Sequence, residues 1–228
     1  METGYEGFRI QEVNFRLTSG DIMALVGKSG SGKSTLIRTL LGINQPDKGK
    51  ITVLVDGIEH DLRDRTGYSS QANSLYDSLT VAENLRTFGK MRGLSTEEIE
   101  DGMDEILENL GISDARNKRV DKLSGGMAKR ADIAVSTIHD PDIVVFDEPF
   151  TGIDPPQRKV IWKSIEKMAD EGKAVIITSH LLRTLSERCN RYGLLHGGKF
   201  YSTDRIEEIM KNQGYKDVKS FLEAAFQL

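Results

Sequence analysis

The chain has one cysteine, Cys189, so no disulfide can form within it. A chain with a single cysteine and no internal disulfide fits a reducing compartment. Long apolar runs are also missing: the longest have about five residues, against the ~20 that a membrane-spanning helix needs. Residues 1–5 (METGY) have neither the basic region nor the apolar core of a signal peptide. We therefore expect any membrane role to depend on a partner.

There is no excess of basic residues, because 31 Lys and Arg stand against 35 Asp and Glu and the net charge is −4. A broad basic surface for nucleic acid is not implied, so we expect no nucleic-acid partner. Hydrophobic residues make up 38% and charged residues 29% of the chain, as in ordinary globular proteins. A length of 228 residues suits one large domain, or one domain with a subdomain.

Residues 27–35 (GKSGSGKST) fit G-x-x-x-x-G-K-[ST], the phosphate loop. An apolar run at 22–26 precedes them and reads as a buried strand, and leucines at helical spacing follow. A strand-to-helix turn of this kind lets backbone N–H groups surround a polyphosphate, and the helix N-terminus favours negative charge. Lys33 is expected to reach the β- and γ-phosphates, and the Ser34 hydroxyl to bind Mg²⁺. The predicted nucleotide-binding residues here are Gly27, Ser29, Gly30, Ser31, Gly32, Lys33, Ser34 and Thr35. The alternative, a glycine-rich turn with an accidental Lys-Ser, is disfavoured by the flanking strand and helix.

The rest of the chain alternates between strand and helix patterns. Continuous apolar runs at 143–146 and 174–177 predict buried parallel strands. No strand pattern lies between residues 73 and 139, where a helix is predicted at 80–91 and a capping box, Ser95 to Glu98, begins another. One or two further strands are predicted at 8–17, one at 51–55 before an Asp-Gly turn, a short one that ends with residues 68–71, and a hairpin at 191–202 through Gly197-Gly198. Two short amphipathic helices are predicted in the tail.

Asp147 and Glu148 directly follow the strand at 143–146, which delivers both carboxylates to the edge where ligands bind in such sheets. Asp147 is suited to hold Mg²⁺, and Glu148 to orient or deprotonate an attacking water. Without the phosphate loop, a solvated acidic turn would be the better interpretation. With the loop, a strand ending in Asp-Glu is its expected counterpart.

Residues 123–127 (LSGGM) begin a helix, with Ser124 as its predicted N-cap. Paired glycines at a helix start form a second possible anion site. Taken alone, this stretch is better interpreted as a capped helix after a loop.

The ordered motifs GKSGSGKST, Gln71, LSGGM, FDEP, Gly152-Ile153-Asp154 and TSH resemble the ATP-binding cassette of ABC transporters over essentially the whole chain. The resemblance implies an α/β fold in one domain, 1–228. Its P-loop NTPase (RecA-like) core, with a small antiparallel β layer, would comprise 1–72 and 140–205. An inserted α-helical subdomain at 73–139 would carry the signature motif, and 206–228 would form a short C-terminal helical tail.

The resemblance also implies roles for single residues. Tyr5 would stack on adenine, with Phe8 as the alternative. Gln71 would bind the metal and link the nucleotide to a membrane partner, and His180 would contact the γ-phosphate, although a lone strand-end histidine more often has no role. Ser124, Gly125 and Gly126 would contact nucleotide bound to a second cassette, and Asp154 would lie at the dimer seam. Met127 and Lys28 depart from common family residues without removing one that hydrolysis needs.

The function implied is hydrolysis of ATP with Mg²⁺ by a head-to-tail dimer, formed with a second copy or a paralogous cassette. A separate transmembrane permease would hold the chain at the inner face of the cell membrane, in the cytoplasm. The tail at 220–226 resembles exporter-type cassettes, while 71–76 resembles the stretch that receives the permease, unless Leu75 and Tyr76 pack under the helical insert. The alternatives are an importer cassette, a non-transport cassette of DNA maintenance or translation, and a P-loop kinase. Trp162 is interpreted as helix packing, and His60, His139, His196 and Cys189 lack metal-ligand spacing.

Overall fold

The computed structural model describes residues 1–5 and 7–227, without the side chains of residues 226 and 227. Phe226, predicted on the apolar face of the last helix, is therefore outside the described side chains. The chain divides into two compact units, which are described separately: unit 1 is 1–65 with 176–228, and unit 2 is 66–175. No helix in the described part combines the length and apolarity needed to cross a membrane.

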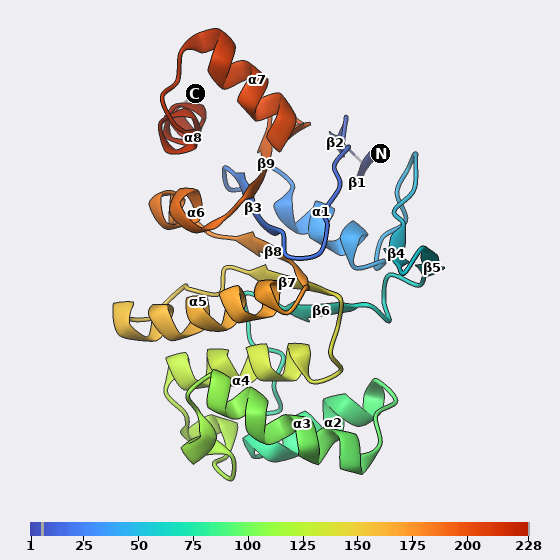
Figure 1. Ribbon diagram of the computed structural model, residues 1–228, viewed down its shortest axis with the longest axis vertical. Helices are drawn as coiled ribbons and strands as arrows, with labels where there is room; N and C mark the ends of the chain where they lie inside the picture. Colours follow the sequence, from blue (N-terminus) through green and yellow to red (C-terminus); the bar gives the residue numbers. More distant parts are fainter. Residues whose placement is uncertain (6, 228) are drawn as a thin grey trace. The chain divides into compact units, whose positions relative to one another are not determined.

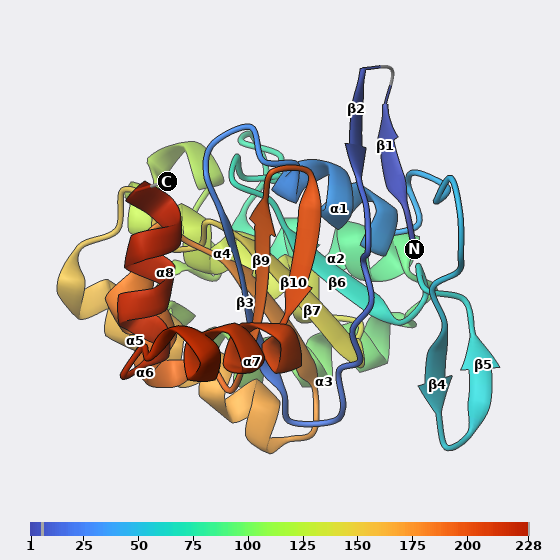
Figure 2. The same ribbon diagram turned by 90° about the horizontal axis from the view of Figure 1, so that it is seen from above.

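The centre of unit 1 is strand β3 (Ile22–Gly27), all six residues of which are buried. β3 runs parallel to β9 (Arg191–His196), which pairs antiparallel with β10 (Lys199–Ser202) through the predicted Gly197-Gly198 turn. Helix α1 (Lys33–Leu40) follows β3. Figure 2 shows α7 (Thr203–Gln213) beside β9 and β10, and α7 contacts α8 (Val218–Gln227). α6 (Leu182–Arg188) contacts α8.

Two hairpins complete unit 1. β1 (Thr3–Tyr5) pairs with β2 (Phe8–Ile10), and β4 (Val53–Val55) pairs with β5 (Ile58–His60). The predicted Asp-Gly turn is confirmed, since Asp56 and Gly57 both have positive φ, as this hairpin turn requires. The strand predicted at 8–17 is shorter than expected and ends at Ile10. Glu12 has a left-handed φ of 60°, which breaks the extended backbone there.

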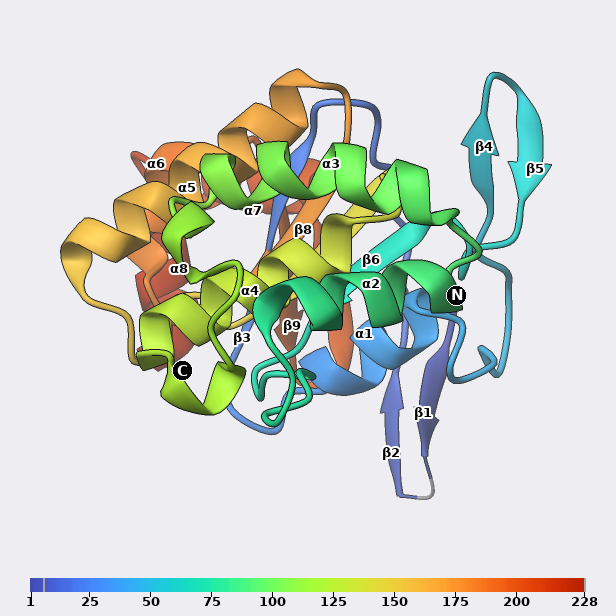
Figure 3. The ribbon, with the colours of Figure 1, turned by 90° about the horizontal axis from the view of Figure 1, so that it is seen from below.

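Unit 2 contains the parallel pair β6 (Thr66–Ser69) and β7 (Ile143–Asp147). Its helices are α2 (Val81–Met91), α3 (Thr96–Asn109), α4 (Gly125–Thr137) and α5 (Pro155–Asp170), with short 3₁₀ turns at 113–115 and 120–122. Figure 1 shows α5 beside α4, and Figure 3 shows α2, α3 and α4 side by side. The chain leaves unit 2 within β8 (Ala174–Thr178).

Local sequence chemistry explains where the helices of unit 2 begin. The predicted capping box of α3 is confirmed, because the Ser95 hydroxyl accepts from the Glu98 N–H and the Glu98 carboxylate accepts from the Ser95 N–H. Thr80 and Glu83 form the same box at α2. Helices α2 and α3 bury one face each, and residues 73–139, predicted as a helical subdomain, lie wholly inside unit 2.

Candidate active site

The phosphate loop joins β3 to α1 in unit 1. Gly32, the N-cap of α1, has φ 100°, and Gly30 has φ 78°, both in the region that favours glycine. A Cβ on Gly32 would lie 2.8 Å from ring carbons of Phe8 and from a methyl group of Ile10. A Cβ on Gly27 would lie 2.7 Å from the carbonyl oxygen of Leu195 on β9. The loop therefore needs glycine at 30 for its conformation, at 27 for its close packing, and at 32 for both.

Three features of the loop fit a polyphosphate. The hydroxyl oxygen of Ser31 is buried and has no hydrogen-bond partner among the described residues. No side chain caps the start of α1, so its first N–H groups face the loop as anion donors. The Nζ atom of Lys33 lies within the same loop, 2.7 Å from the carbonyl oxygen of Gly27. An anionic ligand would supply acceptors for the Ser31 hydroxyl and for the first N–H groups of α1, and an opposite charge for the Lys33 ammonium.

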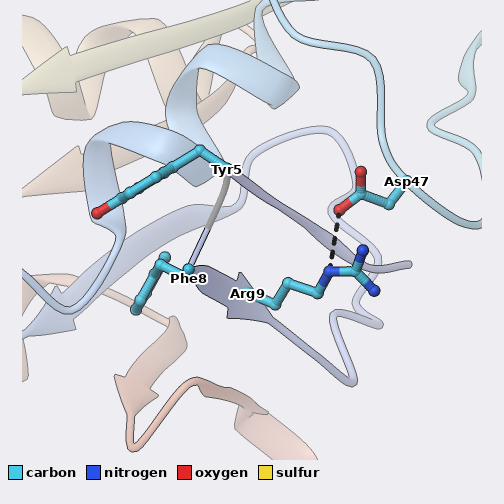
Figure 4. Close-up of a pocket in the computed structure, with 5 residues that line it drawn as sticks. Tyr5, Phe8, Arg9 and Asp47 are labelled. Atoms are coloured by element: carbon cyan, nitrogen blue, oxygen red, sulfur yellow. Dashed lines mark ion pairs between the residues drawn. The ribbon is translucent and has the colours of Figure 1, made fainter.

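Tyr5 and Phe8 lie beside the loop on the β1–β2 hairpin. Their rings stack with centroids 5.5 Å apart. Tyr5 is 66% exposed, whereas Phe8 is half-buried against Gly32. An open depression of about 600 Å³ is lined by these two residues with Gly7, Arg9 and Asp47. Figure 4 shows the Arg9–Asp47 ion pair, 3.9 Å long, away from the two rings. Tyr5 thus offers the accessible aromatic face, and Phe8 supports it from below.

Asp147 ends strand β7 in unit 2, and Glu148 follows it in a left-handed conformation, φ 51°. A residue other than glycine with this φ is strained, and such strain is common where a side chain must be aimed at a ligand. Glu148 is 7% exposed, and its carboxylate accepts a hydrogen bond from the Thr151 hydroxyl at 3.4 Å. The strand and the turn thus deliver two adjacent carboxylates, one of them held in a buried position.

Helix α4 begins at the predicted N-cap. The Ser124 hydroxyl accepts from the Met127 N–H at 3.3 Å, while Ser124 and Gly125 are exposed. A Cβ on Gly125 would meet nothing within 4 Å, so its surroundings are open. Gly126 is buried, and a Cβ there would overlap the side-chain amide of Gln157. This helix start therefore presents one exposed face and is packed closely on the other.

Asp154 is the N-cap of α5. Its carboxylate accepts from the Gln157 N–H at 2.9 Å and from the Gln157 side-chain amide at 2.5 Å. Gln157 therefore touches both Asp154 and Gly126, which are predicted site residues from two different motifs. Sequence reasoning missed Gln157, although the spacing D-x-x-Q at a helix start is a capping-box signal.

Gln71 and His180 are both exposed residues next to strand ends. Gln71 follows β6 in unit 2, and His180 follows β8 in unit 1. Unit 1 thus holds Tyr5, the phosphate loop and His180. Unit 2 holds the remaining predicted site residues: Gln71, Ser124, Gly125, Gly126, Asp147, Glu148 and Asp154.

Sequence reasoning also missed three polar residues inside the apolar helix α4. Arg130 is buried and donates from Nη1 to the carbonyl oxygens of Leu110 and Gly111, at 2.9 and 3.0 Å. Lys129 and Asp132 are buried as well. Their only signal in the sequence is that charges interrupt an otherwise apolar helix.

Comparison with known families gives one match, the ABC transporter family, over residues 10–151. Among curated relatives, a Nod factor export ATP-binding protein I from Rhizobium etli is 35% identical over 204 residues, 88% of this chain and 65% of the relative. The protein of the same name from Cupriavidus pinatubonensis is 32% identical over 207 residues, 90% of this chain and 64% of the relative. The chain thus spans about two thirds of the length of these relatives.

Solved structures share the fold. An ATP-binding subunit of an ABC transporter superposes with a TM-score of 0.84 at 24% identity, covering 99% of this chain and 96% of that chain. CbiO1 from Clostridium perfringens, described as part of the ABC transporter complex cbiONQ, gives a TM-score of 0.75 at 27% identity, covering 90% of this chain and 85% of that chain. The predicted fold class is confirmed by these similarities.

Proposed function

Because the chain belongs to the ABC transporter family, we propose that it binds and hydrolyses ATP to power export through a separate membrane subunit. The ATP-binding part rests on the phosphate loop, which contains Lys33 and a buried Ser31 hydroxyl with no hydrogen-bond partner among the described residues. Export, rather than import or a non-transport role, is supported by the names of the relatives, which are export ATP-binding proteins. The chain would then lie in the cytoplasm, bound to the inner face of the membrane through that subunit.

We propose a role for each site residue from the motif in which it lies. The loop N–H groups and Lys33 bind the phosphates, and Tyr5 stacks on adenine. Ser34, Gln71 and Asp147 would hold Mg²⁺, an ion that would neutralise phosphate charge when bound. Glu148, held in position by its buried turn, orients or deprotonates the attacking water, and His180 binds the γ-phosphate.

We propose that hydrolysis requires a second cassette in head-to-tail arrangement, either a copy of this chain or a paralogue. The exposed residues Ser124 and Gly125 at the start of α4 can donate to a phosphate bound by that second chain. Asp154, also exposed, lies at the seam. The helical subdomain at 73–139 then carries the surface that meets the partner's nucleotide.

The test of this function is Glu148→Gln. The amide keeps the shape of the side chain but is a poor base, so turnover should fall roughly 10²–10⁴-fold while ATP binding persists. The stalled chain should accumulate as an ATP-bound dimer in size-exclusion chromatography. Glu108→Gln, an exposed change on α3, is the matched control. Turnover near the wild-type rate in Glu148→Gln would remove this residue from its role.

The shared site has a separate test. Ser124→Arg should leave ATP binding to the monomer nearly intact and abolish turnover. Mixing it with Lys33→Ala should restore part of the activity, because one of the two sites in the mixed dimer is intact, provided that one site can turn over alone. Loss of nucleotide binding in Ser124→Arg itself would argue against the assignment across the dimer.

A further inference from the structure

Helix α4 directs two buried charged side chains at the loop that carries Gln71. Lys129 is 4% exposed and Asp132 is 2% exposed, on a helix whose other buried positions are mostly apolar. The side chains lie 3.5 Å apart as an ion pair, one turn from each other. Both belong to unit 2, as do the loop and α4 itself.

The two residues hold the loop at both of its ends. One carboxylate oxygen of Asp132 accepts from the Ser69 hydroxyl at 2.6 Å, and the other accepts from the Ser74 N–H at 2.8 Å. The Lys129 ammonium donates to the carbonyl oxygen of Ser70. One turn of α4 therefore fixes the residues on either side of Gln71, while residues 71–74 themselves remain exposed.

Stability alone does not account for a charged pair at this place. A buried ion pair loses its hydration, and apolar residues of similar volume are commonly as stabilising. Burial lowers the pKa of Lys129, and the negative charges of Asp132 and Asp147 oppose that shift. The pair forms directed hydrogen bonds to three points of one loop, which apolar residues could not do.

The same helix begins at Ser124. Lys129 follows Ser124 by five residues, which is about 7–8 Å along a helix axis. α4 is one continuous helix of 13 residues that is buried along most of its length, so we expect it to move as a rigid body. Any displacement of the Gln71 loop is therefore passed through the pair to the exposed helix start, and the reverse holds as well.

We infer that Lys129 and Asp132 are positioning residues that make the Gln71 loop and the Ser124 helix start move as one body. The inference rests on the proposed function, which assigns Gln71 to the metal and Ser124 to the nucleotide of a second cassette. It adds a connection within one chain between the residue that senses its own nucleotide and the surface that meets the partner's nucleotide.

The experiment uses the double variant Lys129→Met/Asp132→Leu in the full chain, because removing both charges leaves neither one buried alone. Hydrogen exchange is followed at residues 70–76 and 123–128, with and without MgATP. In the wild type, MgATP should protect both segments together. In the double variant, residues 70–76 should exchange at least tenfold faster, and protection of one segment should no longer accompany protection of the other.

Kinetics distinguish a positioning role from a merely structural one, because only the former changes kcat while KM stays nearly constant. The double variant should lose roughly 10–100-fold in kcat while KM for ATP stays within about threefold, because the phosphate loop lies in the other unit. Ser69→Ala removes one of the three hydrogen bonds and should lower kcat by a smaller factor. Ser69→Thr keeps the hydroxyl and should keep kcat close to that of the wild type. Ser136→Ala is the matched control, because that buried hydroxyl donates only within α4, to Ile133 at 2.7 Å.

Exchange and kcat like those of the wild type in the folded double variant would overturn the inference. If the double variant does not fold, Ser69→Ala decides, and unchanged exchange at 70–76 with unchanged kcat contradicts the coupling. Exchange at 70–76 without nucleotide tests the connection even if the wild type does not respond to MgATP. An absent MgATP response in the wild type would reject the proposed function, whereas a wild-type response that survives in the double variant rejects only the inference.

Discussion

The Nζ atom of Lys33 donates a hydrogen bond of 2.7 Å to the carbonyl oxygen of Gly27, six residues earlier in the same loop. It donates a second one to the carbonyl oxygen of Lys28 at 3.2 Å. The ammonium is thus held over the loop by neutral acceptors. Phosphate oxygens are charged acceptors and form stronger hydrogen bonds, so a polyphosphate can replace these contacts without moving the lysine far.

Lys33→Met should therefore weaken ATP binding roughly 10–100-fold, the loss expected for hydrogen bonds to a charged group. Because position 33 is half-buried and methionine also has an unbranched side chain, Lys33→Met should leave the melting temperature within a few degrees of the wild type. Isothermal titration calorimetry measures the affinity, and Lys50→Met, an exposed lysine outside the loop, is the control. Equal affinities for wild type and Lys33→Met would contradict the assignment of this lysine to the phosphates.

Tyr5 and Phe8 can be separated by substitution, since one ring is exposed and the other lies under it. Tyr5→Ala should weaken ATP binding by about 1–3 kcal/mol, the value of one base–aromatic stack, without lowering the melting temperature. Tyr5→Trp should retain the affinity. Phe8→Ala should lower the melting temperature, because the ring packs against Gly32 and Ile10. The reverse pattern, with Phe8→Ala alone weakening ATP binding, would assign the adenine to Phe8.

His139 predicts a pH dependence of stability. Burial, followed by the positive charges of Arg92 and Lys173, lowers its pKa from 6.5 to about 4. The unfolded chain therefore binds this proton first as the pH falls. The contribution of His139 to stability is complete above about pH 6.5 and is lost as the pH falls towards 4.

Urea unfolding at pH 7 and pH 5 measures this effect. His139→Gln should reduce the pH-dependent loss of unfolding free energy by about 1–2 kcal/mol, a value already reduced for the part of the ring that solvent reaches. His196→Gln is the control. The same loss between pH 7 and pH 5 in wild type and His139→Gln would show that another group is responsible.

Local patterns predicted much of the fold, because the determinants lie within a few residues of each other. The capping box at Ser95, the N-cap at Ser124 and the Asp56-Gly57 turn are all confirmed, since each depends only on its neighbours in sequence. The strand predicted at 8–17 was too long, because apolar alternation continues past Glu12 although its backbone turns there. Nothing in the pattern indicates a left-handed glutamate.

The candidate site was predictable where chemistry follows a motif and not where it depends on distant contacts. The phosphate loop and Asp147-Glu148 are contiguous stretches next to buried strands. Asp132, in contrast, contacts Ser69 and Ser74, which lie 63 and 58 residues away in the sequence. Only the folded chain shows that these charges serve the Gln71 loop.

Tyr76 combines an exposed ring with a fixed backbone. It is 47% exposed, and its ring centroid lies 5.7 Å from that of Phe88. Its N–H donates to the Asn84 side chain at 2.8 Å, and its carbonyl oxygen accepts from the same side chain at 3.1 Å. A rigidly held, half-exposed aromatic residue loses little conformational entropy when a partner covers it. These properties support Tyr76 as an anchor for a helix of the proposed membrane subunit.

Tyr76→Ala should leave the basal ATPase rate of the chain within a few-fold of the wild type, because the hydrogen bonds between Tyr76 and the Asn84 side chain use the backbone of residue 76, which the substitution keeps. It should abolish or strongly reduce recovery of a co-expressed membrane subunit in a pull-down. Met91→Ala, at a 66% exposed residue on the neighbouring helix α2, controls for the loss of any apolar surface. If Tyr76→Ala unfolds the chain, the ring is part of the packing under α2, and an unchanged pull-down would place the docking surface elsewhere.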